Sequence, residues 1–336
     1  MKEEMFVIAD QYYCQIIAPL MGWEAAAKQN AHWEVGIPEP DMLPAINGLI
    51  VNPAYPLPRE RLLMMRELVV ISAYGVGYDY IDVDAASELG ILVTHTPQAV
   101  INATAELGLA LVLALSRHVV EHDRAIRRLH RPGLKNPVFG HATIAHDASS
   151  QTVGIVGYGR IGQRLRTLLE AVGFRVRYTR AHGPLLQHAG YQDFIELMEE
   201  SDIIVLAVPL TPSTHHLIDS QALGRLKANA SLINISRGAS IDEEALVKAL
   251  ESKKLAKAAL DVFEFEPRIS DALVQLPQVI LSPHAGTLTE ETRMRMTEDA
   301  VSNVLQALEG HAQNAINPSF WTRRPGLEHS RNDDCV

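Results

Sequence analysis

Three short segments of the chain carry residue types that bind a small anion and move a proton. They read N-I-S-R-G at 234–238, D-V-F-E-F-E-P at 261–267 and S-P-H-A-G at 282–286. Each follows a short apolar run that predicts a buried strand, and parallel strands build sites at their C-terminal ends. A planar guanidinium suits a carboxylate, and a histidine exchanges a proton near neutral pH. We therefore take Arg237, Glu266 and His284 as the candidate catalytic residues.

Each of these residues also has a simpler interpretation. The chain holds 14 histidines, and a single histidine is more often structural, while a lone arginine or glutamate is usually a surface charge. Glu264 is a second carboxylate in the same segment and competes with Glu266 as the acidic partner of His284. The E-P pair at 266–267 favours Glu266.

The segment Thr152–Gly162 predicts a dinucleotide-binding turn. It reads T-V-G-I-V-G-Y-G-R-I-G, so that G-x-G-x-x-G follows a predicted strand and precedes a predicted helix. The first glycine permits the tight turn, the second lets the backbone approach a pyrophosphate, and the third allows close packing of helix on strand. The N–H groups and the positive dipole end of the helix then face the phosphates. The predicted cofactor contacts of this turn are Gly157, Gly159, Arg160, Ile161 and Gly162.

The next predicted strand ends at Tyr178-Thr179-Arg180, with His182 close by. A site for NAD carries an acidic residue near this point, where it binds the ribose 2′-hydroxyl. No carboxylate stands here to repel a 2′-phosphate, and Arg180 is able to pair with one. Thr179 and Arg180 therefore favour NADP(H) over NAD(H) as the cofactor. The alternative is that Arg180 is only a solvated surface charge.

The composition indicates a globular protein of two domains. The chain has 336 residues, of which 47% are hydrophobic and 21% charged, so it is long enough for two cores. Its net charge of −10 repels phosphate groups, which makes nucleic acid and anionic membranes poor candidate partners. The start, M-K-E-E, lacks the basic region of a signal peptide, and no apolar run is long enough to span a bilayer. We expect a cytoplasmic protein with Cys14 and Cys335 as reduced thiols.

Short apolar runs alternate with helical patterns along the chain, which predicts parallel sheets covered by helices. The predicted strands lie at 5–9, 48–51, 68–72, 91–94, 152–157, 175–178, 203–208, 231–235, 257–260 and 279–281. A long helical pattern at 103–128 separates the two series of strands, and a final helix at 290–308 is long enough to return to the first domain. We therefore expect two α/β domains, residues 1–102 with 303–336 and residues 103–302.

In this order, the motifs resemble those of the D-isomer-specific 2-hydroxyacid dehydrogenases. N-x-S-R-G, D-V-F-E-x-E-P and P-H-x-G follow G-x-G-x-x-G at spacings that fit the family. Residues 72–82, S-A-Y-G-V-G-Y-D-Y-I-D, resemble the family's substrate loop, and residues 102–113 its interdomain helix. The resemblance covers nearly the whole chain. It implies two doubly wound parallel-sheet domains, a flavodoxin-like substrate domain and a Rossmann cofactor domain, with an active-site cleft between them.

The resemblance also implies a role for each candidate residue. Arg237 binds the substrate carboxylate and polarises the carbonyl, and the backbone amides of Val76 and Gly77 take the other contacts of the carboxylate. His284 donates a proton in reduction and accepts one in oxidation, and Glu266 favours its charged form near neutral pH. The cofactor contacts that the family adds are Thr104, Pro209, Thr211 and Asp261.

The segment D-V-F-E-F-E-P at 261–267 is most similar to the glyoxylate, hydroxypyruvate and 2-ketogluconate reductases. The resemblance therefore implies reduction of a small anionic 2-oxo acid. The interdomain helix and its flanks imply a homodimer. Two alternatives stay open at this point. One is a dinucleotide-sensing interaction protein on the same fold, as some transcriptional corepressors are, and the other is an NAD-linked lactate- or phosphite-type oxidoreductase.

Two further features bear on metal binding and on specificity. The segment 118–122, H-V-V-E-H, matches the H-x-x-E-H pattern of one group of zinc proteases. No third ligand suggests itself, so we expect a solvated helix face and no metal site. Tyr80 stands where the family's substrate loop more usually has asparagine, which leaves the side chain of the preferred substrate open.

Overall fold

The computed structural model describes residues 4–9, 31–129, 144–181, 183–185 and 188–321. The chain divides into two compact units, residues 1–100 with 289–336 (unit 1) and residues 101–288 (unit 2). Unit 1 thus contains the whole of the final long helix. The predicted division instead places a domain boundary inside that helix, between residues 302 and 303. Cys14, His182 and Cys335 lie outside the described residues.

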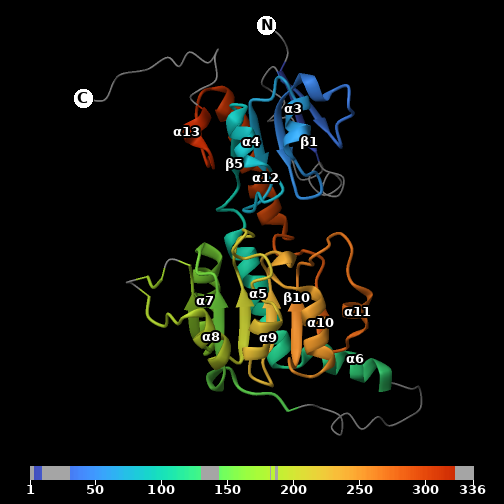
Figure 1. Cartoon of the computed structure of the whole chain (residues 1–336), viewed down its shortest axis with the longest axis vertical. Coiled ribbons are helices and arrows are strands. Elements are labelled where there is room, and N and C mark those ends of the chain that lie inside the picture. The colour runs from blue at the N-terminus through green and yellow to red at the C-terminus, as the bar shows by residue number, and fades with distance from the viewer. Residues whose placement is uncertain (1–3, 10–30, 130–143, 182, 186–187, 322–336) are drawn as a thin grey trace. The chain divides into compact units, whose positions relative to one another are not determined.

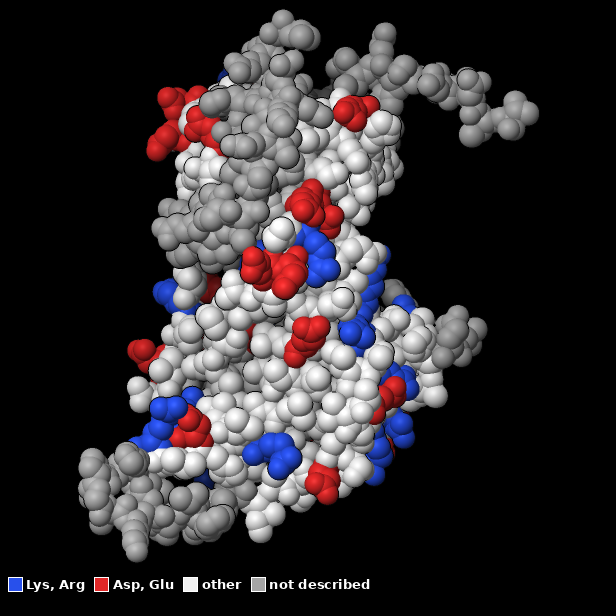
Figure 2. All heavy atoms as spheres, turned by 180° about the vertical axis from the view of Figure 1, so that it is seen from behind, with Lys and Arg blue, Asp and Glu red and all other residues white. Residues whose placement is uncertain are grey.

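Acidic and basic side chains are mixed on the face drawn in Figure 2. On the face drawn in Figure 2, Lys and Arg lie among Asp and Glu and form no single continuous patch among the described residues. Arg225 with Glu199 and Lys227 with Asp202 are exposed ion pairs of unit 2, each with an N–O distance of 2.8 Å. Exposed pairs contribute about 0–1 kcal/mol each to folding, so the stability of the units rests on their cores.

Unit 1 is built on a parallel sheet with the strand order β2-β1-β3-β4-β5. The strands are β1 (Glu4–Ala9), β2 (Ala31–Val35), β3 (Ile46–Val51), β4 (Val70–Ala73) and β5 (Leu92–His95). This is the order of flavodoxin-like folds, so the expected fold class of this domain is confirmed. The sequence pattern misses the edge strand β2, because a strand with one neighbour does not need the continuous apolar run of a doubly covered strand.

The long C-terminal helix belongs to unit 1 because it packs on the sheet of that unit. The described helices of unit 1 are α3 (Arg59–Met64), α4 (Val83–Glu88), α12 (Glu290–Leu308) and α13 (Pro318–Trp321), with a 3-10 turn η1 at Leu43–Ala45. α12 lies against β3, β4 and β5 (Figure 1), and its residues Ala300, Val304 and Ala307 are fully buried. The hydroxyl of Thr289 caps the helix by accepting a hydrogen bond from the Thr292 amide at 3.3 Å.

Unit 2 is built on a parallel sheet with the order β11-β10-β9-β8-β6-β7 (Figure 1). The strands are β6 (Thr152–Val156), β7 (Arg175–Thr179), β8 (Ile203–Leu206), β9 (Ser231–Asn234), β10 (Lys257–Leu260) and β11 (Val279–Leu281). Outside β7, Tyr191 adds one parallel bridge to Tyr178. The strand order reverses between β6 and β8, and doubly wound sheets bind dinucleotides at such a switch point.

One face of this sheet is covered by α5 (Ile101–Ser116) and α7 (Arg160–Val172). Ile155, Val205 and Ile233 point toward these helices and are fully buried. Because side chains alternate along a strand, the neighbouring residues point to the opposite face. The sheet therefore needs a second layer of helices.

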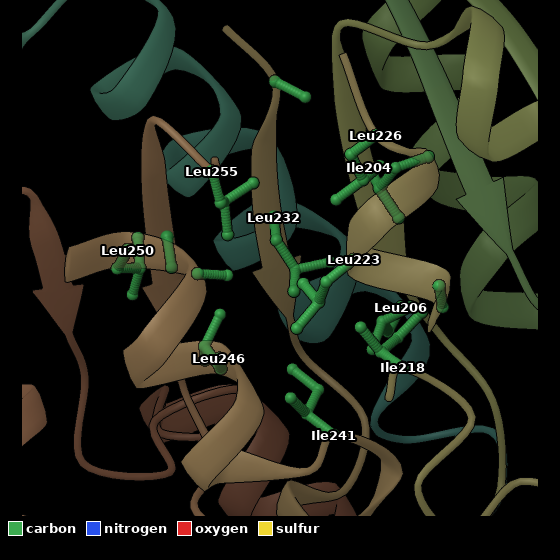
Figure 3. Close-up of a cluster of buried hydrophobic side chains, with 14 of the residues drawn as sticks. Ile204, Leu206, Ile218, Leu223, Leu226, Leu232, Ile241, Leu246, Leu250 and Leu255 are labelled. Atoms are coloured by element: carbon green, nitrogen blue, oxygen red, sulfur yellow. The ribbon is translucent and has the colours of Figure 1, made fainter. Parts of the chain in front are cut away.

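That second layer is made of four shorter helices. They are α8 (Phe194–Glu200), α9 (Ser220–Arg225), α10 (Glu243–Glu251) and α11 (Asp271–Gln275). Figure 3 shows Ile204, Leu206 and Leu232 of the sheet in one cluster with Leu223 of α9 and Leu246 of α10. Both faces of the strands are thus buried, which explains their continuous apolar runs.

The helix that the sequence predicts over 103–128 is broken, so the expectation of one continuous helix is wrong. α5 ends at Ser116 and α6 covers Val119–Leu129, with a bend of 56° between 101–116 and 119–128. His118 lies in the break with a left-handed backbone (φ 55°), and its Nδ1 bonds to Oε2 of Glu121 at 2.7 Å. Lys257 Nζ also contacts the ring nitrogen of His118. A helical period describes both sides of this break equally well, so it does not reveal the break.

The H-x-x-E-H segment is therefore not one face of a regular helix. A lysine ammonium beside His118 opposes the binding of a metal cation at that nitrogen. Within the described ranges, no group of three or more His, Cys, Asp or Glu side chains is placed to hold a metal ion. No single helix in those ranges meets the length and hydropathy needed to cross a membrane, while the bent pair 101–116 with 119–128 does so by length and composition only.

Candidate active site

The turn that carries Arg237 is held by Asn234, the last residue of β9. Asn234 is fully buried, and its Oδ1 accepts hydrogen bonds from the amide and the hydroxyl of Ser236 at 2.9 and 2.7 Å. Its Nδ2 donates to the carbonyl of Arg237 at 2.8 Å. The first and third residues of N-x-S-R-G thus hold the backbone from which the arginine side chain extends.

Gly238 brings this turn against the segment that carries Glu266. A Cβ atom at Gly238 would overlap the backbone of Phe263 and Glu264, so any other residue would push the two segments apart. After Gly238 the chain enters a short 3-10 turn, η4 (Gly238–Ser240). The glycine of N-x-S-R-G therefore serves close approach of two strand ends, and the positive charge of Arg237 is near enough to act on Glu266.

The turn that carries His284 is organised by Asp261, the first residue after β10. Asp261 is 2% exposed, and its two carboxylate oxygens accept hydrogen bonds from the amides of Ala285 and Gly286 at 2.8 and 2.9 Å. Its carbonyl accepts the amide of His284 at 2.8 Å. Such contacts offset the cost of the left-handed backbone at His284 (φ 54°), which a residue other than glycine rarely adopts.

His284 and Glu266 form the central pair of the site. The Nδ1 of His284 lies 3.0 Å from Oε2 of Glu266, while Oε1 of Glu266 accepts the amide of Phe263 at 2.9 Å. The side chain of His284 is 37% exposed, and no hydrogen bond from a described residue engages its Nε2. A carboxylate that accepts from Nδ1–H places the transferable proton on Nε2.

The charges around Glu266 keep its carboxylate ionised. Partial burial by itself would raise the pKa of Glu266. The hydrogen bond and the charge of His284 oppose this, with help from the Phe263 amide and from Arg237, and together they lower the pKa below its usual value. Glu266 is thus a permanent anion beside His284 at neutral pH.

Glu264, the competing carboxylate, is placed elsewhere. Its Oε1 lies 2.7 Å from Nε2 of His216, and its Oε2 accepts the amide of Glu243 at 3.0 Å. The amide of His216 in turn donates to the carbonyl of Ala239 at 2.8 Å. Glu264 therefore ties the loop after β8 to the start of α10, and the choice of Glu266 as partner of His284 agrees with the geometry. Sequence reasoning missed this tie, because nothing in the pattern links His216 to a carboxylate 48 residues away.

The Gly-rich turn after β6 fits a dinucleotide pyrophosphate. Gly157 has a left-handed backbone (φ 99°), and a Cβ atom there would overlap the carbonyl of Ala207. A Cβ at Gly162 would overlap the carbonyl of Gly157, so α7 packs closely on β6. By contrast, a Cβ at Gly159 meets nothing within 4 Å, which leaves the space before the α7 N-terminus free for a ligand's phosphates.

The end of β7 presents Thr179 and Arg180 next to this turn. Thr179 is buried, and its carbonyl accepts the amide of Gly157 at 3.0 Å, so the two strand ends are joined. Among the described residues, no hydrogen bond or ion pair holds the guanidinium of Arg180. The side chain is therefore available to an anionic group bound at the turn.

A tyrosine within the Gly-rich turn escaped the sequence analysis, since the pattern treats its position as variable. The ring of Tyr158 stacks on that of Tyr178 with centroids 3.7 Å apart. Its hydroxyl accepts a hydrogen bond from Arg166 at 3.2 Å and lies 3.0 Å from Nδ1 of His188. These contacts hold the chain that follows β7 against the cofactor turn.

The remaining predicted cofactor residues lie in the loop after β8 and on α5. The hydroxyl of Thr214 donates to the carbonyl of Pro209 at 2.6 Å and accepts the amide of Thr211 at 2.8 Å, so it shapes the turn that carries both. The hydroxyl of Thr104 donates to the carbonyl of Gly286 at 3.2 Å. Thr104 thus holds the turn of His284 in place, whatever it contributes to the cofactor.

The predicted substrate residues Val76 and Gly77 belong to unit 1. They follow β4 in a loop that starts at Gly75 with a left-handed backbone (φ 141°). The hydroxyl of Tyr80 donates to the carbonyl of Val51 at 2.9 Å, which anchors the far end of the loop to β3. The tyrosine that departs from the family pattern therefore has a structural use in this chain.

Comparison with known proteins finds similar proteins that cover most of the chain. Residues 109–286 match the family described as D-isomer specific 2-hydroxyacid dehydrogenase, NAD binding domain. A glyoxylate reductase of Thermococcus litoralis is 39% identical over 287 residues, which are 83% of this chain and 86% of that protein.

Two solved structures illustrate the range of similar proteins. An NADPH-dependent glyoxylate/hydroxypyruvate reductase from Sinorhizobium meliloti, in complex with NADP and malonate, is 28% identical with a TM-score of 0.79 and covers 94% of this chain and 97% of its own. A D-lactate dehydrogenase from Aquifex aeolicus, complexed with NAD and lactic acid, is 27% identical with a TM-score of 0.82 and covers 94% of this chain and 99% of its own.

Proposed function

Because this chain belongs to the D-isomer-specific 2-hydroxyacid dehydrogenases, we propose that it works chiefly as an NADPH-dependent reductase of a small 2-oxo acid. Glyoxylate, hydroxypyruvate and 2-ketogluconate are the substrates of first choice. The observation that carries the proposal is the pair of His284 and Glu266 at 3.0 Å, within reach of the charge of Arg237.

Arg237 binds the carboxylate of the 2-oxo acid and polarises the neighbouring carbonyl. Its guanidinium forms two parallel hydrogen bonds with a carboxylate, which sets the orientation of the substrate as well as its affinity. On a chain with a net charge of −10, such a local cation is needed to attract an anion. The amides of Val76 and Gly77 complete the contacts of the carboxylate.

His284 supplies the proton of the reaction from Nε2. The bound nicotinamide cofactor supplies the hydride when the carbonyl carbon is reduced. The carbonyl oxygen then gains negative charge, and Nε2–H of His284 neutralises it by proton transfer. Glu266 holds the ring through Nδ1 and balances the charge of the imidazolium, and Asp261 holds the backbone on which His284 stands. In oxidation, Nε2 accepts the proton of the hydroxyl.

We predict that Glu266→Gln lowers kcat by about tenfold or more at neutral pH, because the histidine loses its anionic partner. It also changes the pH dependence of stability. The pKa of Glu266 is lowered by folding, so its carboxylate stabilises the protein above the pKa of the unfolded chain, and this contribution is lost as the pH falls through the folded pKa. Urea unfolding of both proteins between pH 7 and pH 3 should show a difference that shrinks toward low pH.

The matched control is Glu244→Gln, since Glu244 is 80% exposed and, in the described part of the chain, forms an ion pair only with Lys248 on its own helix. This variant should leave kcat within about twofold of the wild type. If Glu266→Gln keeps full activity, or if its stability deficit is the same at every pH, Glu266 does not partner His284 as proposed.

One assay tests the reaction itself. Purified protein is mixed with NADPH or NADH and a panel of 2-oxo acids that includes glyoxylate, hydroxypyruvate, 2-ketogluconate and pyruvate. Turnover with glyoxylate or hydroxypyruvate and NADPH is the expected result. Turnover with pyruvate and NADH alone would place the chain with the NAD-linked lactate type, which the D-lactate dehydrogenase neighbour represents.

The preference for NADPH rests on Arg180. It follows β7 directly, and its guanidinium has no partner among the described residues. We predict that Arg180→Ala raises the KM for NADPH about tenfold, because one charge-assisted contact to the 2′-phosphate is lost, and leaves the KM for NADH unchanged. Initial rates over a range of each cofactor measure both values. The control is Arg177→Ala, since Arg177 is an exposed residue of β7.

An equal change of both KM values would mean that Arg180 does not read the 2′-phosphate.

The proposal further includes a homodimer in the cytoplasm, where the two thiols stay reduced. α6 supports the dimer, since Val119 and Ile126 on it are 55% and 52% exposed and would gain from coverage. Sedimentation equilibrium at micromolar protein concentration distinguishes a dimer from a monomer.

A further inference from the structure

The substrate loop of unit 1 is attached to the end of β5 through two consecutive carbonyl groups. The carbonyl of Gly75 accepts a hydrogen bond from the backbone amide of Thr96 at 2.8 Å. The next carbonyl, that of Val76, lies 2.9 Å from Nδ1 of His95. Since a carbonyl oxygen only accepts, His95 must carry its proton on Nδ1 in this contact.

These two contacts set the direction of two amide groups. In a planar trans peptide, the C=O of one residue and the N–H of the next point in opposite directions. The amides of Val76 and Gly77 therefore point away from Thr96 and His95. Within the described residues neither amide donates a hydrogen bond, and Val76 is 38% exposed. Two parallel, unused N–H groups on adjacent residues form a natural place for an anion.

We propose that His95 is a positioning residue, which orients the Val76–Gly77 peptide so that the Gly77 amide binds the substrate carboxylate. This inference rests on the proposed function, because it concerns the same substrate. The Gly75 carbonyl is held by a backbone amide, which no substitution of a side chain removes. The Val76 carbonyl is held by the side chain of His95, so a substitution of His95 is able to change the orientation of the Val76–Gly77 peptide.

The position of His95 itself is well defined by its surroundings. Its amide donates to the carbonyl of Asn314 at 3.3 Å, and its carbonyl accepts from Nδ2 of Asn303 at 3.0 Å. The ring of Tyr78 meets the imidazole edge-on, with centroids 5.8 Å apart and an interplanar angle of 80°. A hydrogen bond accepted at the Val76 carbonyl also polarises the peptide, which strengthens the Gly77 amide as a donor.

Three substitutions of His95 test this role. Asparagine places a donor nitrogen at the same distance from the backbone as Nδ1, glutamine moves it one carbon farther, and alanine removes it. We expect His95→Ala and His95→Gln to raise the KM for glyoxylate about tenfold, the value of one hydrogen bond, with kcat lowered less than threefold. His95→Asn should stay close to the wild type, and the KM for NADPH should not change in any of the three.

A binding measurement gives a second readout that does not depend on turnover. Oxalate, a small dicarboxylate, is titrated into the NADPH complex of each variant by calorimetry, and its affinity should fall by the same factor as glyoxylate KM rises. Thermal unfolding checks that each variant is folded.

The inference is overturned if His95→Ala binds oxalate and glyoxylate as the wild type does. It is also overturned if His95→Asn is impaired as strongly as His95→Ala, because then the packing of the ring on Tyr78 matters and not the hydrogen bond. Failure of the proposed function looks different, since the wild type itself would then turn over no 2-oxo acid.

Discussion

Replacing His284 with alanine is expected to lower kcat for glyoxylate reduction by about 10²–10⁴-fold, the usual contribution of a general acid. The reaction leaves negative charge on the carbonyl oxygen, and without the imidazole that charge must take its proton from water. The KM for NADPH should change little, because His284 contacts Glu266 and the backbone of Asp261 and not the Gly-rich turn. Steady-state rates at saturating NADPH measure the effect.

Two controls separate the loss of the acid from general damage. His311→Ala removes an exposed histidine of unit 1 and should leave kcat unchanged. In the double variant His284→Ala with Glu266→Gln, kcat should be no lower than in His284→Ala alone, since Glu266 acts through the histidine. If the two losses instead multiply, Glu266 has a role of its own in the reaction. Full activity of His284→Ala would rule out the proposed mechanism.

Replacing Arg237 with lysine is expected to lower kcat/KM for the 2-oxo acid by about 10²–10³-fold, although the charge is retained. The backbone of Arg237 is held by Asn234, and Gly238 sets its distance from the Glu266 segment, so the reach of the side chain decides the outcome. A lysine ammonium is a point charge and makes no paired contact with a planar carboxylate. Arg237→Ala should lower kcat/KM further still.

The matched control is Arg225→Lys, since Arg225 is exposed on α9 and pairs with Glu199 at 2.8 Å. It should leave kcat/KM within about twofold of the wild type. Initial rates with glyoxylate at low concentration give kcat/KM directly, and urea unfolding shows whether the variants are equally stable. A lysine variant with kcat/KM near that of the wild type would mean that no paired contact exists at this position.

Local patterns predicted the two parallel sheets and all of their strands except the edge strand β2 of unit 1. Side chains of a parallel strand are buried on both faces, so β8 and β9 are marked by apolar runs that no surface segment shares. The ends of such strands converge on one edge of a sheet. Arg237, Glu266 and His284 follow three of these strands, so their placement at strand ends predicted that they lie near one another.

The partners of individual side chains were decided only by the tertiary structure. Glu264 and Glu266 belong to the same segment, and the fold sends one to His216 and the other to His284. Gly238 also lets the Arg237 turn lie against the backbone of Phe263 and Glu264, a close approach that no periodicity predicts. At the break in the helix, the fold likewise places Lys257, from a distant strand, in contact with His118.

His95 shows the same division most clearly. The sequence does not single out His95, because a histidine at the end of a strand such as β5 is ordinary. Its ring contacts the carbonyl of Val76, 19 residues away in the sequence. The pairing of β4 with β5 brings the two residues together. Periodicity determines which residues form a strand, since that depends on neighbours along the chain. A hydrogen bond about 3 Å long depends on where two separate strands end in space, so it is decided only when the sheet is assembled.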